Sequence, residues 1–457
     1  MLAMNDILPK TGRFFSTNKS ILAIAFWYLA LYPGRLGYDY SLAIRMIQQG
    51  ESTNWWTAFY FWILRISSFN GRSIALISLI GLLVLAYSLK FFLDALISSK
   101  RVAEKTLFFT LLTPLYGVFG ATVSHDVFQT AAILLFLGIF WRLYSKTISS
   151  RELGIVFISA SLLMITTQTG IFTVVFAAVL LTVFKFRKEA LLGLVIALVV
   201  SLVSNFGIGP SIIKNPLVNI LLVDMKCVVQ HPEAEVSVDN WKVLDSLADR
   251  SLWLEPKSCS SPDDIIKGLG TGSKEIPIQE SLIKTYLQLL AAHPAIVLQA
   301  HLQRSLGALP PPFFQGPRNQ VDQNIDNPVG LGTNTALQLG PEILHPSIDE
   351  PSVAKKIGFL KPLEVVAQIP TFLVNQASWF WGWGGLWLWP LIGFYLYSLK
   401  IRKFFLLITL LSPTLILHLS YVVVGPSPLG RYYFSTILAG FSLSVAMICK
   451  SLLSKEG

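Results

Sequence analysis

Asp39 is the first residue whose type and position could do chemistry. It lies a few residues after a Pro33-Gly34 break at the end of an apolar segment, between Tyr38 and Tyr40. A carboxylate at such a boundary can act as a general base, and its charge stays outside the hydrocarbon, where ionised groups are costly. An acid just before a helical pattern can instead cap that helix. This stretch alone supports a catalytic role and a capping role equally.

A second acid, Asp126, follows Ser124 and His125 at the start of another apolar segment. A carboxylate beside an imidazole can hold a divalent cation such as Mg²⁺ or Mn²⁺, or can serve as a base. An acid in the first turn of a helix is also stabilised by the helix dipole. Because Asp39 and Asp126 each lie at a segment boundary beside a ring, we favour one shared site over two separate caps.

One basic residue, Arg431, opens the last apolar segment in the sequence Gly430-Arg431-Tyr432, and its turn holds no other Lys or Arg. A guanidinium fits an anionic partner such as a phosphate, with Tyr432 as a neighbouring substrate contact. An arginine at a membrane boundary can also snorkel into the headgroup layer. Both interpretations of Arg431 stay open.

The composition indicates the kind of scaffold that must position these residues. Of 457 residues, 53% are hydrophobic and 14% are charged, and the mean hydropathy is +0.59. Soluble domains carry about 25% charged residues. We therefore expect an all-α, multi-pass (polytopic) protein of the plasma (inner) membrane.

Several function classes are disfavoured. The formal net charge is +10, but Lys and Arg lie beside apolar segments rather than in one patch, which argues against nucleic acid as a partner. The sequence contains no Walker motif, dinucleotide fingerprint, HExxH or GxSxG. It thus gives no sign of ATP hydrolysis, NAD use or a serine triad.

Apolar runs long enough to cross a bilayer occur about ten times. The expected spans cover residues 16–33, 72–94, 104–121, 125–145, 151–168, 170–186, 189–207, 379–400, 403–424 and 431–453. Lys and Arg gather in alternate connections, which by the positive-inside rule places both termini in the cytoplasm. Asp39, Asp126 and Arg431 then all lie on the outer side.

The first outer loop, residues 34–71, is too polar to cross. We expect two short interfacial helices in it, one over Ser41–Gln49 and an aromatic one from Asn54 to Arg65. Trp55 and Trp56 of the second helix are candidate substrate contacts at the headgroup level, and Tyr38 and Tyr40 are candidate substrate contacts beside Asp39.

Three regions follow from these spans: an N-terminal membrane module (1–206), a large outer loop (207–377) and C-terminal membrane helices (378–457). Within the large loop, Ser281–Leu306 has the apolar periodicity of an amphipathic helix. Pro294 is expected to kink that helix.

The cysteines concern the same large loop. Cys227 and Cys259 fall inside it, whereas Cys449 lies in the last apolar segment. An outer compartment is oxidising, so we expect a disulfide between the two loop cysteines. Two free thiols stay the alternative, because spacing does not reveal connectivity.

The layout resembles the GT-C superfamily of multi-pass glycosyltransferases, which use polyprenyl-phosphate sugars. The stretch Tyr32–Tyr40 is similar to the start of bacterial members, where a Pro-Gly and an Asp follow the first helix. Ser124-His125-Asp126 matches the position of the second acid, without a full Asp-x-Asp or Asp-Glu pair. The sequence Gly430–Tyr433 is similar to an Arg-Tyr element near the last helix. Residues 207–377 match no known sugar-binding module.

The resemblance implies an inverting transfer of a sugar from a polyprenyl-phosphate donor to a glycan, lipid or protein acceptor outside the membrane. Asp39 would act as base on the acceptor, or orient it. Asp126 with His125 would hold a divalent cation against the lipid phosphate, or position the donor directly. Arg431 would neutralise the phosphate leaving group.

Two other functions compete. An O-antigen-type polymerase or ligase also has many spans and one large outer loop, but it would use basic and His residues of that loop. A non-enzymatic lipid or sugar transporter should instead show polar or broken helices at mid-membrane depth.

Overall fold

The computed structural model describes residues 18–36, 38–53, 57–167, 170–205, 211–212, 216–255, 280–304, 360–376, 384–399, 404–424 and 434–454. Most of these residues are helical, and the strands among them are only two residues long. The expected all-α class is therefore confirmed for the described part of the chain.

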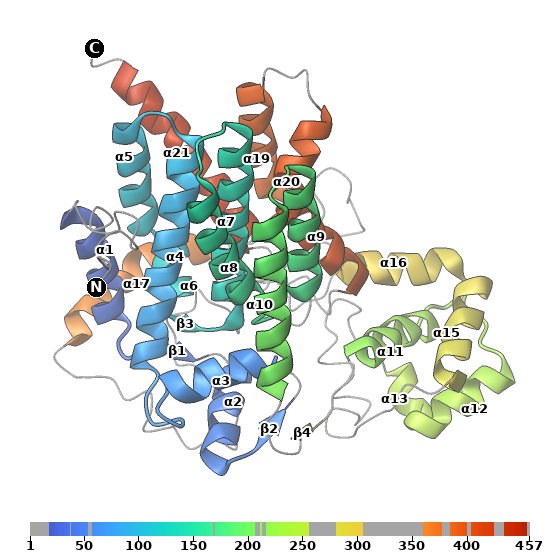
Figure 1. The fold of residues 1–457 in the computed structure, drawn as a ribbon. Helices are drawn as coiled ribbons and strands as arrows, with labels where there is room; N and C mark the ends of the chain where they lie inside the picture. Colours follow the sequence, from blue (N-terminus) through green and yellow to red (C-terminus); the bar gives the residue numbers. More distant parts are fainter. Residues whose placement is uncertain are drawn as a thin grey trace.

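Most helices pack in one bundle, and most of its members are drawn upright in Figure 1. Its members are α1 (Asn18–Ala30), α4 (Ala75–Leu96), α5 (Lys100–Leu111), α6 (Pro114–Gly120), α7 (His125–Tyr144), α8 (Ser150–Met164), α9 (Gly170–Val183), α10 (Arg187–Asn205), α17 (Lys361–Gln376), α19 (Gly384–Leu399), α20 (Phe404–Val424) and α21 (Phe434–Ser454). The central member is α7, whose residues 126–140 are all buried. A helix that is apolar all round needs partners on every face, and α4, α8, α20 and α21 supply them.

Three of the described helices are long and apolar enough to cross a membrane: α4, α7 and residues 434–451 of α21. A bent pair of helices, Glu280–Ala292 with Pro294–His301, would make a fourth if it were one span. Parts of α1, α9, α19 and α20 are apolar but shorter. Membrane association is thus supported, while the full count of about ten spans stays a prediction.

The predicted span over residues 104–121 is wrong as a single helix. The chain forms α5 up to Leu111 and then α6 from Pro114. Proline lacks an N–H and disfavours helical backbone in the residue before it. Thr113 accordingly takes an extended conformation, with a ψ of 150°.

The predicted first outer loop, residues 34–71, contains two short helices, as expected. They are α2 (Tyr38–Gln49) and α3 (Ala58–Ser67). Their apolar sides, including Ile44, Tyr60 and Leu64, share one buried cluster with Ile77 of α4. Because α2 begins three residues before the predicted Ser41, Asp39 lies in its first turn.

Two pairs of short parallel strands connect distant segments. One pair joins β1 (Arg35–Leu36) to β3 (Thr122–Val123). The other joins β2 (Ser52–Thr53) to β4 (Ser211–Ile212). The first pair holds the segment before Asp39 against the segment before Asp126.

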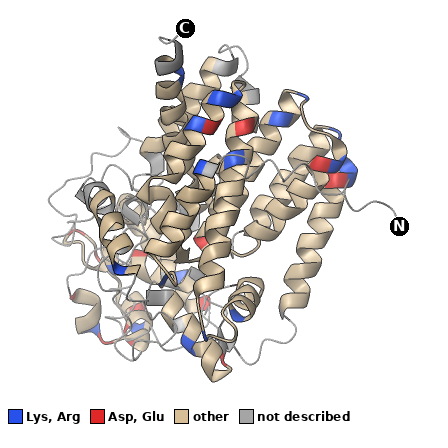
Figure 2. Cartoon of the chain, turned by 90° about the vertical axis from the view of Figure 1, so that its left-hand side faces the viewer, with Lys and Arg blue, Asp and Glu red and all other residues tan. Residues whose placement is uncertain are grey.

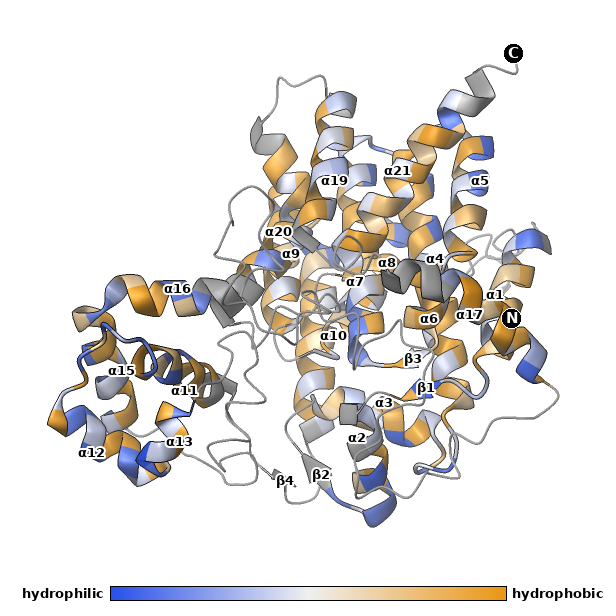
Figure 3. Ribbon diagram, turned by 180° about the vertical axis from the view of Figure 1, so that it is seen from behind, coloured by the Kyte–Doolittle hydropathy of each residue, from blue (hydrophilic) through white to orange (hydrophobic). Residues whose placement is uncertain are grey.

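The predicted outer loop holds a separate helical lobe, seen beside the bundle in Figures 1 and 3. Its helices are α11 (Pro216–Val229), α12 (Val238–Leu247), α13 (Arg250–Leu254), α15 (Glu280–Ala292) and α16 (Pro294–Arg304). They enclose their own apolar core, which includes Leu222 and Trp253. The predicted break at Pro294 is confirmed, since α15 and α16 meet there at a bend of 111°. Sequence reasoning missed α11, α12 and α13, and also α17, which packs against α1 and α6.

Charged residues gather at the end of the bundle that carries the C terminus (Figure 2). Several of them pair there: Lys90 with Asp94 at 2.5 Å and Arg142 with Glu152 at 2.7 Å. The candidate site lies toward the opposite end, near α2 and β3. This polarity agrees with the expected charge alternation, and the side of the membrane that each end faces stays a prediction.

Candidate active site

Gly34 allows the two acid-bearing segments to approach each other. Its φ is +132°, and a Cβ there would lie 1.8 Å from Ser78 Oγ. Ser78 Oγ donates to the carbonyl oxygen of Ala121 at 2.9 Å, and the N–H of Arg35 donates to the same oxygen at 3.1 Å. Only glycine fits a left-handed conformation packed this closely. The Pro33-Gly34 break therefore has a structural reason, which is to dock β1 beside β3.

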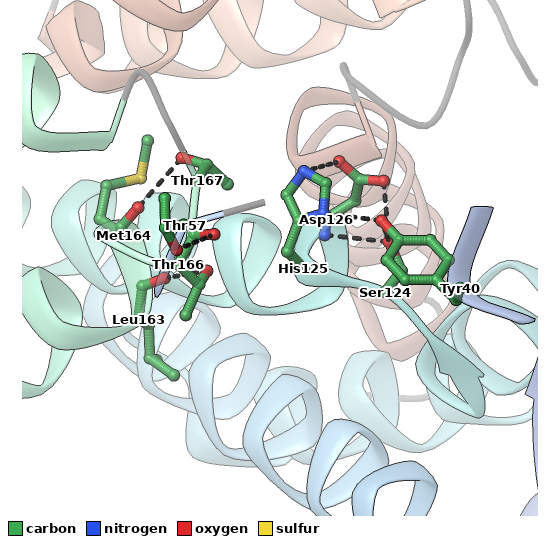
Figure 4. A network of polar contacts seen from close by, with 9 residues as sticks. All are labelled: Tyr40, Thr57, Ser124, His125, Asp126, Leu163, Met164, Thr166 and Thr167. Atoms are coloured by element: carbon green, nitrogen blue, oxygen red, sulfur yellow. Dashed lines mark hydrogen bonds and ion pairs between the residues drawn. The ribbon is translucent and has the colours of Figure 1, made fainter. Parts of the chain in front are cut away.

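Four side chains meet where α2 approaches the start of α7 (Figure 4). Tyr40 Oη lies 2.7 Å from His125 Nδ1 and 2.8 Å from Ser124 Oγ. Ser124 Oγ also lies 2.8 Å from Asp126 Oδ2 and accepts the N–H of Asp126 at 3.0 Å. His125 Nε2 lies 3.4 Å from Asp126 Oδ1. The contacts thus form a ring through Tyr40, Ser124, Asp126 and His125.

The number of protons in this ring assigns the tautomer of His125. For an ionised Asp126, Ser124 gives its single hydroxyl proton to the carboxylate, which can only accept. Tyr40 must then supply the proton of its contact with Ser124. His125 Nδ1 consequently carries the hydrogen directed at Tyr40. In a neutral imidazole, this leaves Nε2 unprotonated, next to Asp126 Oδ1.

Because His125 Nε2 and Asp126 Oδ1 both accept protons, their separation of 3.4 Å favours a positively charged partner between them. That partner can be a proton taken from a substrate hydroxyl or a divalent cation. The Asp126 side chain is only 1% exposed, whereas that of His125 is 22% exposed. The imidazole is therefore the part of the pair that a substrate can reach.

A divalent cation was an expectation from the sequence, and the pair is suited to contribute to it. Neighbouring oxygen and nitrogen ligands of a Mg²⁺ ion lie about 3 Å apart, from bonds of about 2.1 Å at right angles. The separation of 3.4 Å between His125 Nε2 and Asp126 Oδ1 is close to that value. Within the described residues, no group of three or more His, Cys, Asp and Glu could hold a metal ion. The cation therefore stays a prediction that requires further ligands.

Tyr60 belongs to this site, and sequence reasoning missed it. Its ring centroid lies 5.6 Å from that of His125 and 6.1 Å from that of Tyr40. Burial, more than the nearby charge of Asp126, raises the pKa of Tyr60 well above its ordinary value of 10.0. Its hydroxyl is buried and has no hydrogen-bond partner among the described residues. The only sequence signal was its place in the aromatic helix of the first outer loop.

The remaining predicted site residues are described in part or not at all. Tyr38 and Asp39 are described in backbone only, as the first turn of α2. Two ranges with predicted site residues lie outside the described residues. They are 54–56, with Trp55 and Trp56, and 425–433, with Arg431 and Tyr432.

The start of α21, three residues after Arg431, is described. There the ring of Phe434 stacks on Phe119 of α6, with centroids 3.7 Å apart. Phe119 lies shortly before Ser124 in the chain. The start of the last helix is thus beside the segment that leads into the site.

The expected disulfide is supported on one side. Cys227 is disulfide-bonded, and Cys449 is a buried free thiol. The predicted partner, Cys259, lies outside the described residues. The pairing of Cys227 with Cys259 therefore stays a prediction.

Comparisons with protein-family models, with curated proteins and with solved structures found no match to this chain.

Proposed function

We propose that this chain is a membrane glycosyltransferase that moves a sugar from a polyprenyl-phosphate donor to an acceptor outside the membrane. The observation that supports it best is the contact of Tyr40 Oη with His125 Nδ1 at 2.7 Å. This contact joins the segment of Asp39 to the segment of Asp126, the two acids that the sequence singled out. Both stretches also carry the resemblance to GT-C enzymes.

In this proposal, the ring of contacts prepares the acceptor side of the reaction. Tyr40 and Ser124 hold His125 in the tautomer whose Nε2 carries no proton. Asp39 takes the proton from the acceptor hydroxyl or amide, or orients that group for attack on the anomeric carbon. A cation bound by His125 and Asp126 would supply positive charge toward the donor phosphate. Arg431 and Tyr432 would contact the leaving phosphate, and Tyr38, Trp55 and Trp56 the bound lipid or sugar.

The proposed topology has about ten spans, with both termini in the cytoplasm and residues 207–377 outside. A donor carried by a lipid explains why the acids lie at one end of the bundle. It also fits a sequence with no nucleotide-binding loop.

Two described histidines of the outer lobe, His293 and His301, favour this site over the polymerase or ligase alternative. His293 Nε2 lies 3.0 Å from the carbonyl oxygen of Glu235, and His301 Nδ1 lies 3.3 Å from buried Asp224. Both rings thus contact the lobe itself. A catalytic histidine needs instead to reach its substrate.

The test is sugar transfer by the purified protein in lipid, with a panel of polyprenyl-phosphate sugars and detection of released polyprenyl phosphate. Asp39→Asn should reduce transfer by about 10²–10⁴-fold, the usual contribution of a general base. Asp126→Asn should weaken transfer, and added Mg²⁺ or Mn²⁺ should partly restore it.

The matched control is Asp94→Asn, the same chemical change at a partly exposed residue. Asp94 lies near the C-terminal end of α4, away from the candidate site. It should retain full transfer. Wild-type transfer by folded Asp39→Asn, or no release of polyprenyl phosphate with any donor, would refute the proposed function.

A further inference from the structure

The bent pair α15–α16 is as apolar as a membrane span, but its shape prevents it from crossing as one. Over Glu280–Ala292 and Pro294–His301, the pair has the length and the apolar composition of a span. The two helices meet at 111°. A single span needs about 20 residues in one direction. Its apolar residues must therefore serve another purpose.

One face of this pair is accounted for by the lobe. Leu282 and Leu289 of α15, with Val297 and Ala300 of α16, are buried in the core of the lobe. Asp224 of α11 fixes both helices from inside the lobe. Its Oδ2 lies 3.4 Å from Tyr286 Oη and 3.3 Å from His301 Nδ1. The bend is thus held in place by polar and apolar contacts together.

The other face is apolar and exposed. Leu287 is 55% exposed and Leu298 is 56% exposed, and Ile283 is exposed on the same side of α15 as Leu287. Residues four apart share one face of a helix, so Ile283 and Leu287 form a continuous stripe. Large apolar side chains gathered in this way mark a surface that meets another apolar phase.

The position of α16 identifies that phase. It packs against α20 of the bundle, whose Leu419 is 61% exposed. In Figures 1 and 3, α16 runs across the direction of the upright bundle helices, and α11, α12 and α13 lie on its side away from the Lys- and Arg-rich end. The face of α16 that does not pack on the lobe is therefore directed toward the end of the bundle that is rich in Lys and Arg, along the height occupied by the apolar bundle helices.

Two exposed ion pairs of the lobe lie on α12 and α13. Asp239 and Lys242 of α12 form an exposed pair at 2.9 Å, and Arg250 pairs with Asp245. Ionised groups such as these are costly in hydrocarbon, so this part of the lobe has to stay in water. An element with an apolar face on one side and charged helices on the other is suited to a membrane surface.

We propose that α15–α16 docks the lobe onto the lipid bilayer, with the exposed stripe in the boundary between headgroups and acyl chains. The bilayer is its partner, rather than a second protein, because α16 continues the apolar surface of α20. The exposed Lys284 beside the stripe suits the headgroup layer. This inference rests on membrane association and is independent of the proposed sugar transfer.

The test measures the depth of single fluorophores in proteoliposomes. Leu298→Cys is labelled in a Cys449→Ser background and exposed to lipids brominated at different depths. We expect quenching that is strongest for bromines near the headgroups. Leu287→Cys serves as a second position in case Leu298→Cys does not fold.

The matched control is Val238→Cys on α12, an apolar residue of the same lobe that is 73% exposed. It should show no quenching. Equal quenching at residues 238 and 298, or none at residues 287 and 298, would overturn the proposal. Quenching that is strongest at the bilayer centre would also overturn it, because α15–α16 would then enter the hydrocarbon as a span.

Discussion

The hydroxyl of Tyr40 joins the two acid-bearing segments by side-chain contact. Tyr40→Phe removes its contacts with His125 Nδ1 and Ser124 Oγ and leaves the ring in place. Tyr40 is 3% exposed, so the phenylalanine fits and water does not easily replace the hydroxyl. Losing one partner of a buried hydrogen bond costs about 1–3 kcal/mol.

The same energy sets the expected loss of activity. The contact with Tyr40 is what favours the Nδ1–H tautomer of His125. Without that bias of about 1–3 kcal/mol, the ratio of the Nδ1–H tautomer to the Nε2–H tautomer falls by about 5- to 150-fold, at 1.36 kcal/mol for each factor of ten. We expect the transfer rate to fall by at most this factor, and the free energy of unfolding to fall by about 1–3 kcal/mol.

The assay is the release of polyprenyl phosphate, measured beside the unfolding of the same preparation in denaturant. Tyr397→Phe is the matched control, because Tyr397 on α19 is 76% exposed and its hydroxyl lies far from the site in sequence. A folded Tyr40→Phe protein with wild-type transfer would show that the hydroxyl does not set the state of His125. The role assigned to the ring of contacts would then be refuted.

Three further outcomes are expected. Gly34→Ala should lower the free energy of unfolding by about 1–3 kcal/mol and reduce transfer, because its φ of +132° and the contact with Ser78 exclude a Cβ; unchanged stability would contradict this. Tyr60→Phe should raise the free energy of unfolding by about 1 kcal/mol, since its buried hydroxyl has no partner in the described part of the chain. The free energy of unfolding of Tyr60→Phe should also fall less than that of the wild type above pH 10, because in the wild type the unfolded tyrosine ionises there while the raised pKa keeps the folded one neutral. An equal slope with pH in the two proteins would count against this. Labelling of single cysteines from outside should reach positions in 230–270 and not in 98–103, and the reverse result would invert the proposed topology.

Several features of the fold could be read from local sequence. Apolar segments and their turns located most helices, and the aromatic and amphipathic patterns predicted α2 and α3. Pro294 predicted the bend between α15 and α16. These features depend on periodicity and backbone restriction, which act over a few residues and are visible in any short stretch. The break at Pro114 could have been read in the same way, but the apolar run around it favoured one long helix.

The candidate site was predictable in its residues and not in its geometry. The sequence by itself determined that Tyr40, His125 and Asp126 lie at the boundaries of apolar segments, where polar groups remain accessible. Only the tertiary structure decided that Tyr40 meets His125, which is 85 residues away in the chain. It also brought in Tyr60, whose sequence signal was no different from that of its aromatic neighbours. The physical reason is that such contacts depend on how β1 docks beside β3 and how α2 and α3 pack on α4, and packing between distant segments leaves no periodic trace in either of them.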